Sequence, residues 1–244
     1  MDPPEEPPQE SSAASAEPSA EPSEEPEWAM QLAVHAEKTD PPARGAVCAA
    51  TAMAVVRVLT EPDEQWREAV RRWESGPVRK VTRRARGVRW TAVQRLPGVT
   101  VEWAGAEVRA FVPGPVTRVS PELAKLQVAG LDLPEDPSGT DDAPDPPYAV
   151  IALNPNVRMS TGKAAAQSGH AAHLLVRLAA EPDRSAWLAA GAPVRIIHPK
   201  DAEAWSRAVA GAAVAVRDAG FTEVPAGTMT AVARIVRAAP PRSE

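Results

Sequence analysis

The chain has 244 residues, a formal net charge of −5 and a hydrophobic fraction of 44%, which is enough for the core of one large or two small domains. Its start lacks the basic residues and apolar run of a signal peptide, and no stretch approaches the roughly 18 apolar residues of a membrane span. The single cysteine, Cys48, excludes an internal disulfide. We therefore expect a cytoplasmic protein without a membrane partner.

Charge is distributed unevenly along the chain. Residues 1–27 are almost wholly Pro, Glu, Ser and Ala with nine acids and no base, so we expect a disordered tail. Residues 132–147 hold six acids and no apolar period, which is typical of a linker. In the remainder, 27 bases outnumber 17 acids by ten, an excess that suits a polyanionic partner. The densest basic cluster comprises Arg71, Arg72, Arg79, Lys80, Arg83, Arg84, Arg86 and Arg89. The alternative interpretation of this cluster is a solvated helical face.

The two blocks on either side of this linker, residues 28–131 and 148–237, align at a shift of 120 residues. Each begins with an apolar run typical of a strand and continues with an alanine-rich predicted helix. In both blocks the sequence Glu-Pro-Asp follows that helix, at 61–63 and at 181–183. We interpret this as an internal duplication. The alternative is a chance agreement of one helix and its terminator.

The second block alternates between strand and helix patterns. Such alternation implies crossover connections and a mixed sheet with helices packed on it. We therefore predict an α/β fold of two similar units, each with a mixed four-stranded sheet. The predicted strands of the second block are 148–153, 193–198, 213–218 and 230–236, and its helices are 162–180 and about 201–212.

Two segments of the second block carry polar residues that could form a site. Lys163, Gln167 and His170 are spaced to share one face of the first helix, whose N-terminal turn suits a phosphate or carboxyl oxygen. Asp218 ends a predicted strand and is followed by three threonines around the turn at 225–227. Taken alone, the first segment could be a solvated face and the second a simple hairpin.

Together the two segments resemble the type-2 peptidyl-tRNA hydrolase family. Both family patterns occur in the right order and at nearly the family's spacing. Met159, Gly162, Lys163, Ala165, Ala166, Gln167, His170 and Ala171 match the first pattern. Asp218, Ala219, Gly220, Thr222, Gly227, Thr228 and Thr230 match the second.

The resemblance implies hydrolysis of the ester that joins a peptide to the terminal ribose of tRNA, without a cofactor or metal. Asp218 or His170 would orient or deprotonate the water, and which of them is the base stays open. Lys163 would stabilise the oxyanion or hold the terminal phosphate. The expected substrate-binding residues are Gln167, Thr222, Gly227, Thr228 and Thr230.

Some positions depart from the family pattern. Ser160-Thr161 replaces the usual Gly-Lys, Phe221 stands where Arg is common, and Glu223 replaces the usual Gln. Glu223 puts a negative charge beside a site meant to face RNA. The alternative function is therefore a non-catalytic RNA-binding or regulatory module that keeps the fold.

The first block lacks the candidate site residues. Ala43, Val47 and Ala50 fall on the positions of the helical Lys, Gln and His, so we interpret this block as a catalytically dead copy. Because the family resembles a homodimer-former, the dead copy is expected in the second subunit's place, as an intramolecular pseudo-dimer.

Two other known motifs are only partly present in the second block and are rejected. The sequence around Lys163 does not follow a phosphate-binding loop, and His170 with His173 lacks the Glu of a zinc peptidase.

Overall fold

The computed structural model describes residues 26–61, 63–135, 143–220 and 222–238. They form two α/β units, each with its own mixed sheet, which confirms the predicted fold class. Most of the expected disordered tail, and residues 136–142 of the expected linker, lie outside the described residues.

The N-terminal unit is built on a sheet with strand order β2-β1-β4-β3. Strand β1 runs parallel to β2 and antiparallel to β4, and the short β5 adds to the other end of β1. Its elements are β1 (Trp28–His35), α1 (Arg44–Thr60), α2 (Glu64–Glu74), β2 (Arg79–Ala85), α3 (Val88–Val93), β3 (Gly98–Trp103), β4 (Ala106–Phe111), β5 (Gly114–Pro115), a 3-10 turn (Val116–Arg118) and α4 (Pro121–Ala124).

The C-terminal unit repeats this order as β7-β6-β9-β8, again with one parallel and two antiparallel pairings. A shared strand order is what an internal duplication would produce. All four strands predicted for this unit are present, and α6 is an addition to the expected elements. The elements are β6 (Tyr148–Leu153), α5 (Thr161–Leu178), α6 (Asp183–Ala189), β7 (Val194–Ile197), α7 (Ala202–Ala210), β8 (Val214–Arg217) and β9 (Met229–Val236).

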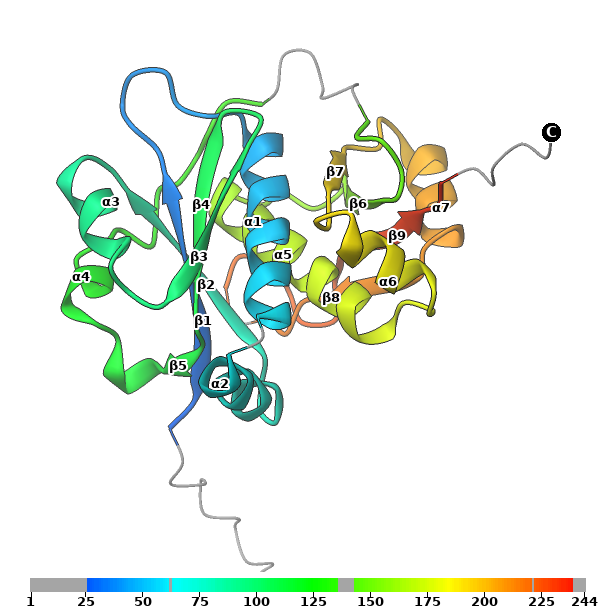
Figure 1. The fold of residues 1–244 in the computed structure, drawn as a ribbon. Helices are drawn as coiled ribbons and strands as arrows, with labels where there is room; N and C mark the ends of the chain where they lie inside the picture. Colours follow the sequence, from blue (N-terminus) through cyan, green and yellow to red (C-terminus); the bar gives the residue numbers. More distant parts are fainter. Residues whose placement is uncertain (1–25, 62, 136–142, 221, 239–244) are drawn as a thin grey trace, which may run out of the picture.

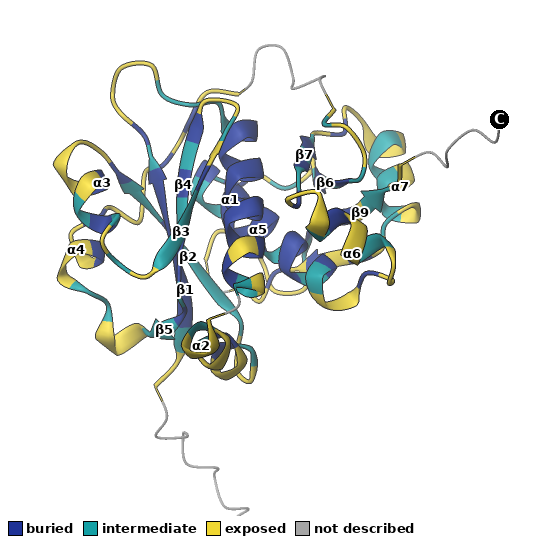
Figure 2. Cartoon of the chain, viewed as in Figure 1, coloured by how far each residue is buried: buried dark blue, intermediate teal, exposed yellow. Residues whose placement is uncertain are grey.

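The two units meet through their longest helices, α1 and α5, which lie between the two sheets (Figure 1). Helix α1 is apolar on nearly all sides, as expected of a helix covered by both neighbours, and Figure 2 shows it almost wholly buried. Gly169 of α5 permits the close approach, because a Cβ there would lie 3.1 Å from Cγ2 of Val55 on α1. One buried apolar cluster therefore runs through both units.

The first residues of the predicted linker pack at this junction. Leu133 is buried, and its N–H donates to Oγ1 of Thr161 at the start of α5 (3.0 Å). Arg44 at the start of α1 donates its N–H to the carbonyl oxygen of Pro134 (2.9 Å). The segment after α4 thus ties the starts of α1 and α5 together.

Among the helices of the described residues, none is by itself long and apolar enough to cross a membrane. Helices α1 and α2 pass that test only as a bent pair.

Candidate functional site

A cavity of about 820 Å³ lies where the C-terminal unit faces β2 of the N-terminal unit. One side is formed by α5 and by the chain that follows β8. The other is formed by residues 78–82, at the start of β2, with Val128. The C-terminal unit therefore does not enclose this cavity alone.

A connected polar network lies along the C-terminal side of the cavity. Nζ of Lys163 forms an ion pair with Oδ2 of Asp218 (2.5 Å) and donates to Oγ1 of Thr222 (2.8 Å). The amide of Gln167 donates to the same Oδ2 (2.9 Å) and accepts from the hydroxyl of Thr230 (2.5 Å). Five of the residues predicted from sequence are thus in direct contact.

The chain after β8 holds Asp218 in place through its backbone. The N–H of Gly220 donates to Oδ1 of Asp218 (2.8 Å), and the N–H of Gly227 donates to the Asp218 carbonyl oxygen (2.7 Å). Gly220 has φ +83°, and a Cβ there would lie 2.8 Å from the backbone nitrogen of Ala226, so only glycine fits without rearrangement. Thr228 accepts the Asp218 N–H with its carbonyl oxygen (2.9 Å). Gly227 and Thr228 therefore act here by shaping the loop.

The Lys163–Asp218 pair is well covered, with side-chain exposures of 10% and 5%. Charges this far from water are stable only when they are paired and hydrogen-bonded, as they are here. A lysine ammonium has three donors, and two are used by Asp218 and Thr222. The third has no partner among the residues that the structure describes and is available to an acceptor oxygen of a ligand in the cavity.

His170 lines the same cavity but stays outside this network. Its Nδ1 lies 3.2 Å from Nζ of Lys80, which comes from β2 of the N-terminal unit. Burial, and then the nearby Lys80, lower the pKa of His170 well below its ordinary value, so the imidazole is neutral at pH 7. Lys80 belongs to the basic cluster noted in the sequence, and its contact with His170 was not predicted.

His173, one turn further along α5, joins the two units. It stacks on Trp73 with ring centroids 5.2 Å apart, and its Nε2 lies 2.6 Å from a carboxylate oxygen of Glu74. Burial lowers the pKa of His173 to about 3. Glu74 also pairs with Arg177 (2.9 Å). No group of three or more His, Cys, Asp or Glu side chains within the described ranges is arranged to hold a metal ion.

The start of α5 is capped by a carboxylate. Glu223 accepts the Ser160 N–H (2.8 Å) and the Ser160 hydroxyl (2.6 Å), and that hydroxyl in turn accepts the N–H of Lys163 (3.2 Å). This carboxylate fills the helix end that sequence analysis considered for a phosphate. Phe221 lies outside the described residues.

The corresponding region of the N-terminal unit has no comparable network in its described part. Val47 and Ala50 of α1 are fully buried among apolar neighbours. The long connection between β8 and β9 is replaced by a tight turn between β3 and β4, where Ala104 and Gly105 have positive φ.

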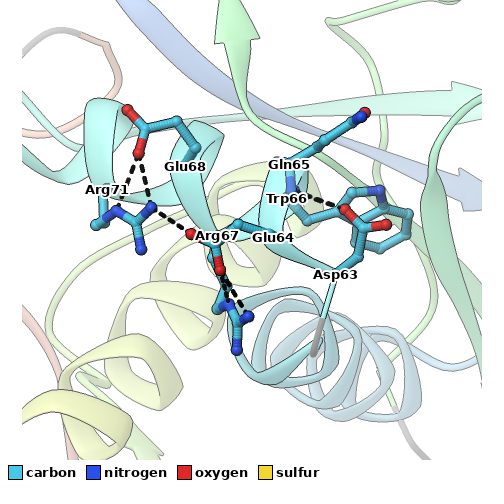
Figure 3. Close-up of polar contacts among 7 residues, drawn as sticks. All are labelled: Asp63, Glu64, Gln65, Trp66, Arg67, Glu68 and Arg71. Carbon is cyan, nitrogen blue, oxygen red and sulfur yellow. Dashed lines mark hydrogen bonds and ion pairs between the residues drawn. The ribbon is translucent and has the colours of Figure 1, made fainter.

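Several arginines of the predicted basic cluster make contacts within the N-terminal unit. On α2, Arg71 pairs with Glu64 and Glu68 (Figure 3). Arg83 donates to the side chain of Gln31 (2.8 Å), and Arg84 donates to the carbonyl oxygen of Ala36 (3.1 Å). The positive charge of these side chains is therefore partly used in holding this unit together.

Residues 148–235 match the family model described as peptidyl-tRNA hydrolase PTH2. The matched range contains the whole Lys163–Asp218 network and ends one residue before the end of β9, while the N-terminal unit lies outside it. No curated protein matches the chain.

Proposed function

We propose that the C-terminal unit, a PTH2 domain by this match, hydrolyses the ester bond of peptidyl-tRNA and releases free tRNA and peptide. The observation that carries the proposal is the ion pair between Lys163 and Asp218, supported by Gln167 and Thr222, on the wall of a cavity. The network lies entirely within the residues that match the family.

Ester hydrolysis requires a positioned water, a base to take its proton, and donors for the developing oxyanion. The free donor of Lys163 suits the carbonyl oxygen of the ester, where negative charge develops. Asp218 is held by Gly220 and Gln167 with oxygen lone pairs to spare, so it can position a water and accept its proton. The other candidate base is His170, which lines the same cavity. The hydroxyl of Thr222 can form a hydrogen bond with a ribose hydroxyl.

The proposed partner is the tRNA portion of the substrate. Outside the tail and linker the chain has an excess of ten positive charges, which favours a polyanion. Neutralising phosphates releases condensed counterions, so we expect binding to weaken steeply as salt rises. The Glu223 carboxylate at the start of α5 would repel a phosphate at that position. We therefore expect the tRNA phosphate backbone to contact other surfaces of the protein.

The test is hydrolysis of an N-acetyl-aminoacyl-tRNA by the full chain and by Lys163→Met. Methionine keeps the aliphatic stem and removes the donor. We expect kcat to fall by about 10²- to 10³-fold, as for the loss of one oxyanion donor. Lys200→Met, an exposed lysine outside the cavity, serves as the matched control and should hydrolyse like the wild type. Full activity in Lys163→Met would rule out the proposed mechanism.

A non-catalytic RNA-binding module is the second candidate. The observation that favours it over the hydrolase is the Glu223 carboxylate bound to Ser160, because it places a negative charge at the start of α5 beside Lys163, while the excess of positive charge elsewhere would still attract RNA. Wild-type protein that binds tRNA in a salt-dependent way but leaves the ester intact would support this candidate over the hydrolase.

A further inference from the structure

Among the residues that the N-terminal unit contributes to the cavity, Lys80 is held on several sides. Nζ of Lys80 lies 4.6 Å from the centroid of the Trp73 ring and 3.2 Å from Nδ1 of His170. Its stem packs against Gly169, where a Cβ would lie 3.3 Å from Cδ of Lys80. Lys80 is therefore fixed against α5 by packing as well as by its polar head.

The contact with Nδ1 constrains where the imidazole carries its proton. A neutral imidazole has one donor and one acceptor nitrogen, whereas an ammonium can only donate. Burial lowers the pKa of Lys80 well below its ordinary value, while the Glu74 carboxylate opposes this, and the face of Trp73 favours a cation. When Lys80 donates, Nδ1 must accept, and the His170 proton resides on Nε2.

We propose that Lys80 is a positioning residue of the N-terminal unit, which holds His170 in the Nε2-protonated tautomer and makes it a hydrogen-bond donor in the cavity. The inference rests on the proposed hydrolase function and refines it, because a His170 with its proton on Nε2 cannot take a proton from water at that nitrogen. Asp218 is then the base.

The remaining geometry agrees with a donor role. Within the described part of the chain, Nε2 of His170 has no hydrogen-bond partner, so it is free for a ligand. Lys163 and His170 are seven residues apart on α5, which separates them by about 10 Å along the helix. The cavity thus offers two donors to acceptor oxygens at two points of one elongated substrate.

The tautomer can be measured directly, because the chain has only four histidines. The full chain labelled with ¹⁵N-histidine gives one long-range ¹H–¹⁵N pattern for each ring, and His170→Gln assigns the relevant one. We expect the Nε2–H pattern for His170 in the wild type. Lys80→Met keeps the stem and removes the donor, so the pattern should become mixed or change to Nδ1–H. Lys80→Arg can only donate, so the Nε2–H pattern should return.

Activity supplies the second readout. In Lys80→Met we expect kcat to fall by about 10-fold or more, because misplacing a catalytic group can cost up to about 10²-fold, and Lys80→Arg should recover part of the loss. Lys38→Met, an exposed lysine of the same unit, is the control. Similar melting curves for all three variants would show that folding is intact.

A His170 pattern of Nδ1–H in the wild type, or an unchanged pattern in Lys80→Met, would overturn the inference even if the chain is an active hydrolase. If the chain does not cleave peptidyl-tRNA at all, the proposed function fails while the change of tautomer still tests Lys80. The two proposals can therefore fail separately.

Discussion

The two units share a strand order and differ in what their central helices carry. Helix α5 presents Lys163 and Gln167 to a cavity, whereas α1 has buried apolar residues such as Val47 in the matching positions. A sheet with a packed helix needs only apolar faces and helix caps, so it survives the loss of polar residues. A site needs particular polar groups and a loop long enough to hold them, as between β8 and β9.

The N-terminal unit lacks the helical polar residues and still contributes to the chemistry proposed for its neighbour. Its strand β2 forms one side of the cavity, and Lys80 reaches His170. That this unit is a degenerate copy in the place of a second subunit remains a prediction, which the shared strand order supports.

The largest expected effect comes from removing one member of the buried ion pair, which is present in the C-terminal unit and has no counterpart on α1. Asp218→Ala leaves the Lys163 ammonium buried without its partner, which we expect to lower the free energy of unfolding by about 3 kcal/mol and to abolish most hydrolysis. The double variant Lys163→Met/Asp218→Leu makes this site apolar, like its counterpart on α1.

Chemical denaturation would measure these changes. The double variant should recover much of the lost stability while hydrolysis stays absent. If Asp218→Ala alone were as stable as the wild type, the pair would not be a buried interaction in solution.

Acidification should weaken the junction between the units through His173. Its pKa is lowered to about 3 in the folded protein, so below pH 6.5 the unfolded chain binds a proton that the folded chain does not. The contribution of His173 to the free energy of unfolding is thus fully present above pH 6.5 and declines by on the order of 1 kcal/mol per pH unit as pH falls toward 3. The matching position on α1 is Met53, which cannot titrate.

Denaturation curves between pH 7 and 4 test this effect. His173→Phe can still stack on Trp73, and its stability should depend less on pH than that of the wild type. Identical pH dependence in the two proteins would assign the effect to other groups.

Gly169→Ala should affect the junction by a smaller amount. The new Cβ would lie 3.1 Å from Val55 and 3.3 Å from Lys80, so we expect a loss of about 1–2 kcal/mol from overpacking. The control substitution on α1 is Gly45→Ala, whose new Cβ would have no atom within 4 Å and which should be neutral or slightly stabilising. Thermal melts would compare them, and equal melting temperatures would mean that α1 and α5 approach less closely.

The smallest expected effect concerns Glu223. Glu223→Gln keeps an oxygen for Ser160 and removes the negative charge, so tRNA binding should tighten by up to about fivefold in Kd at low salt. A filter-binding titration at two salt concentrations measures the change. Weaker binding in this variant would show that the carboxylate supports the RNA interface.

Much of the C-terminal unit could be predicted because its signals are local. Helical spacing and the family resemblance indicated Lys163, Gln167, Asp218 and the two threonines that contact them. Helix α6 was missed because its burial depends mainly on Trp187, one residue in a short segment. Lys80 could not be assigned to the site, since its contact with His170 spans 90 residues and depends on how two units pack.

Single-turnover hydrolysis of an N-acetyl-aminoacyl-tRNA, with the full chain in excess over substrate, tests the central claim most directly. The account predicts first-order release of free tRNA by the wild type, and by Lys163→Met a rate about 10²- to 10³-fold lower with tRNA still bound. Wild-type protein that leaves the ester intact, or equal rates in the two proteins, would contradict it.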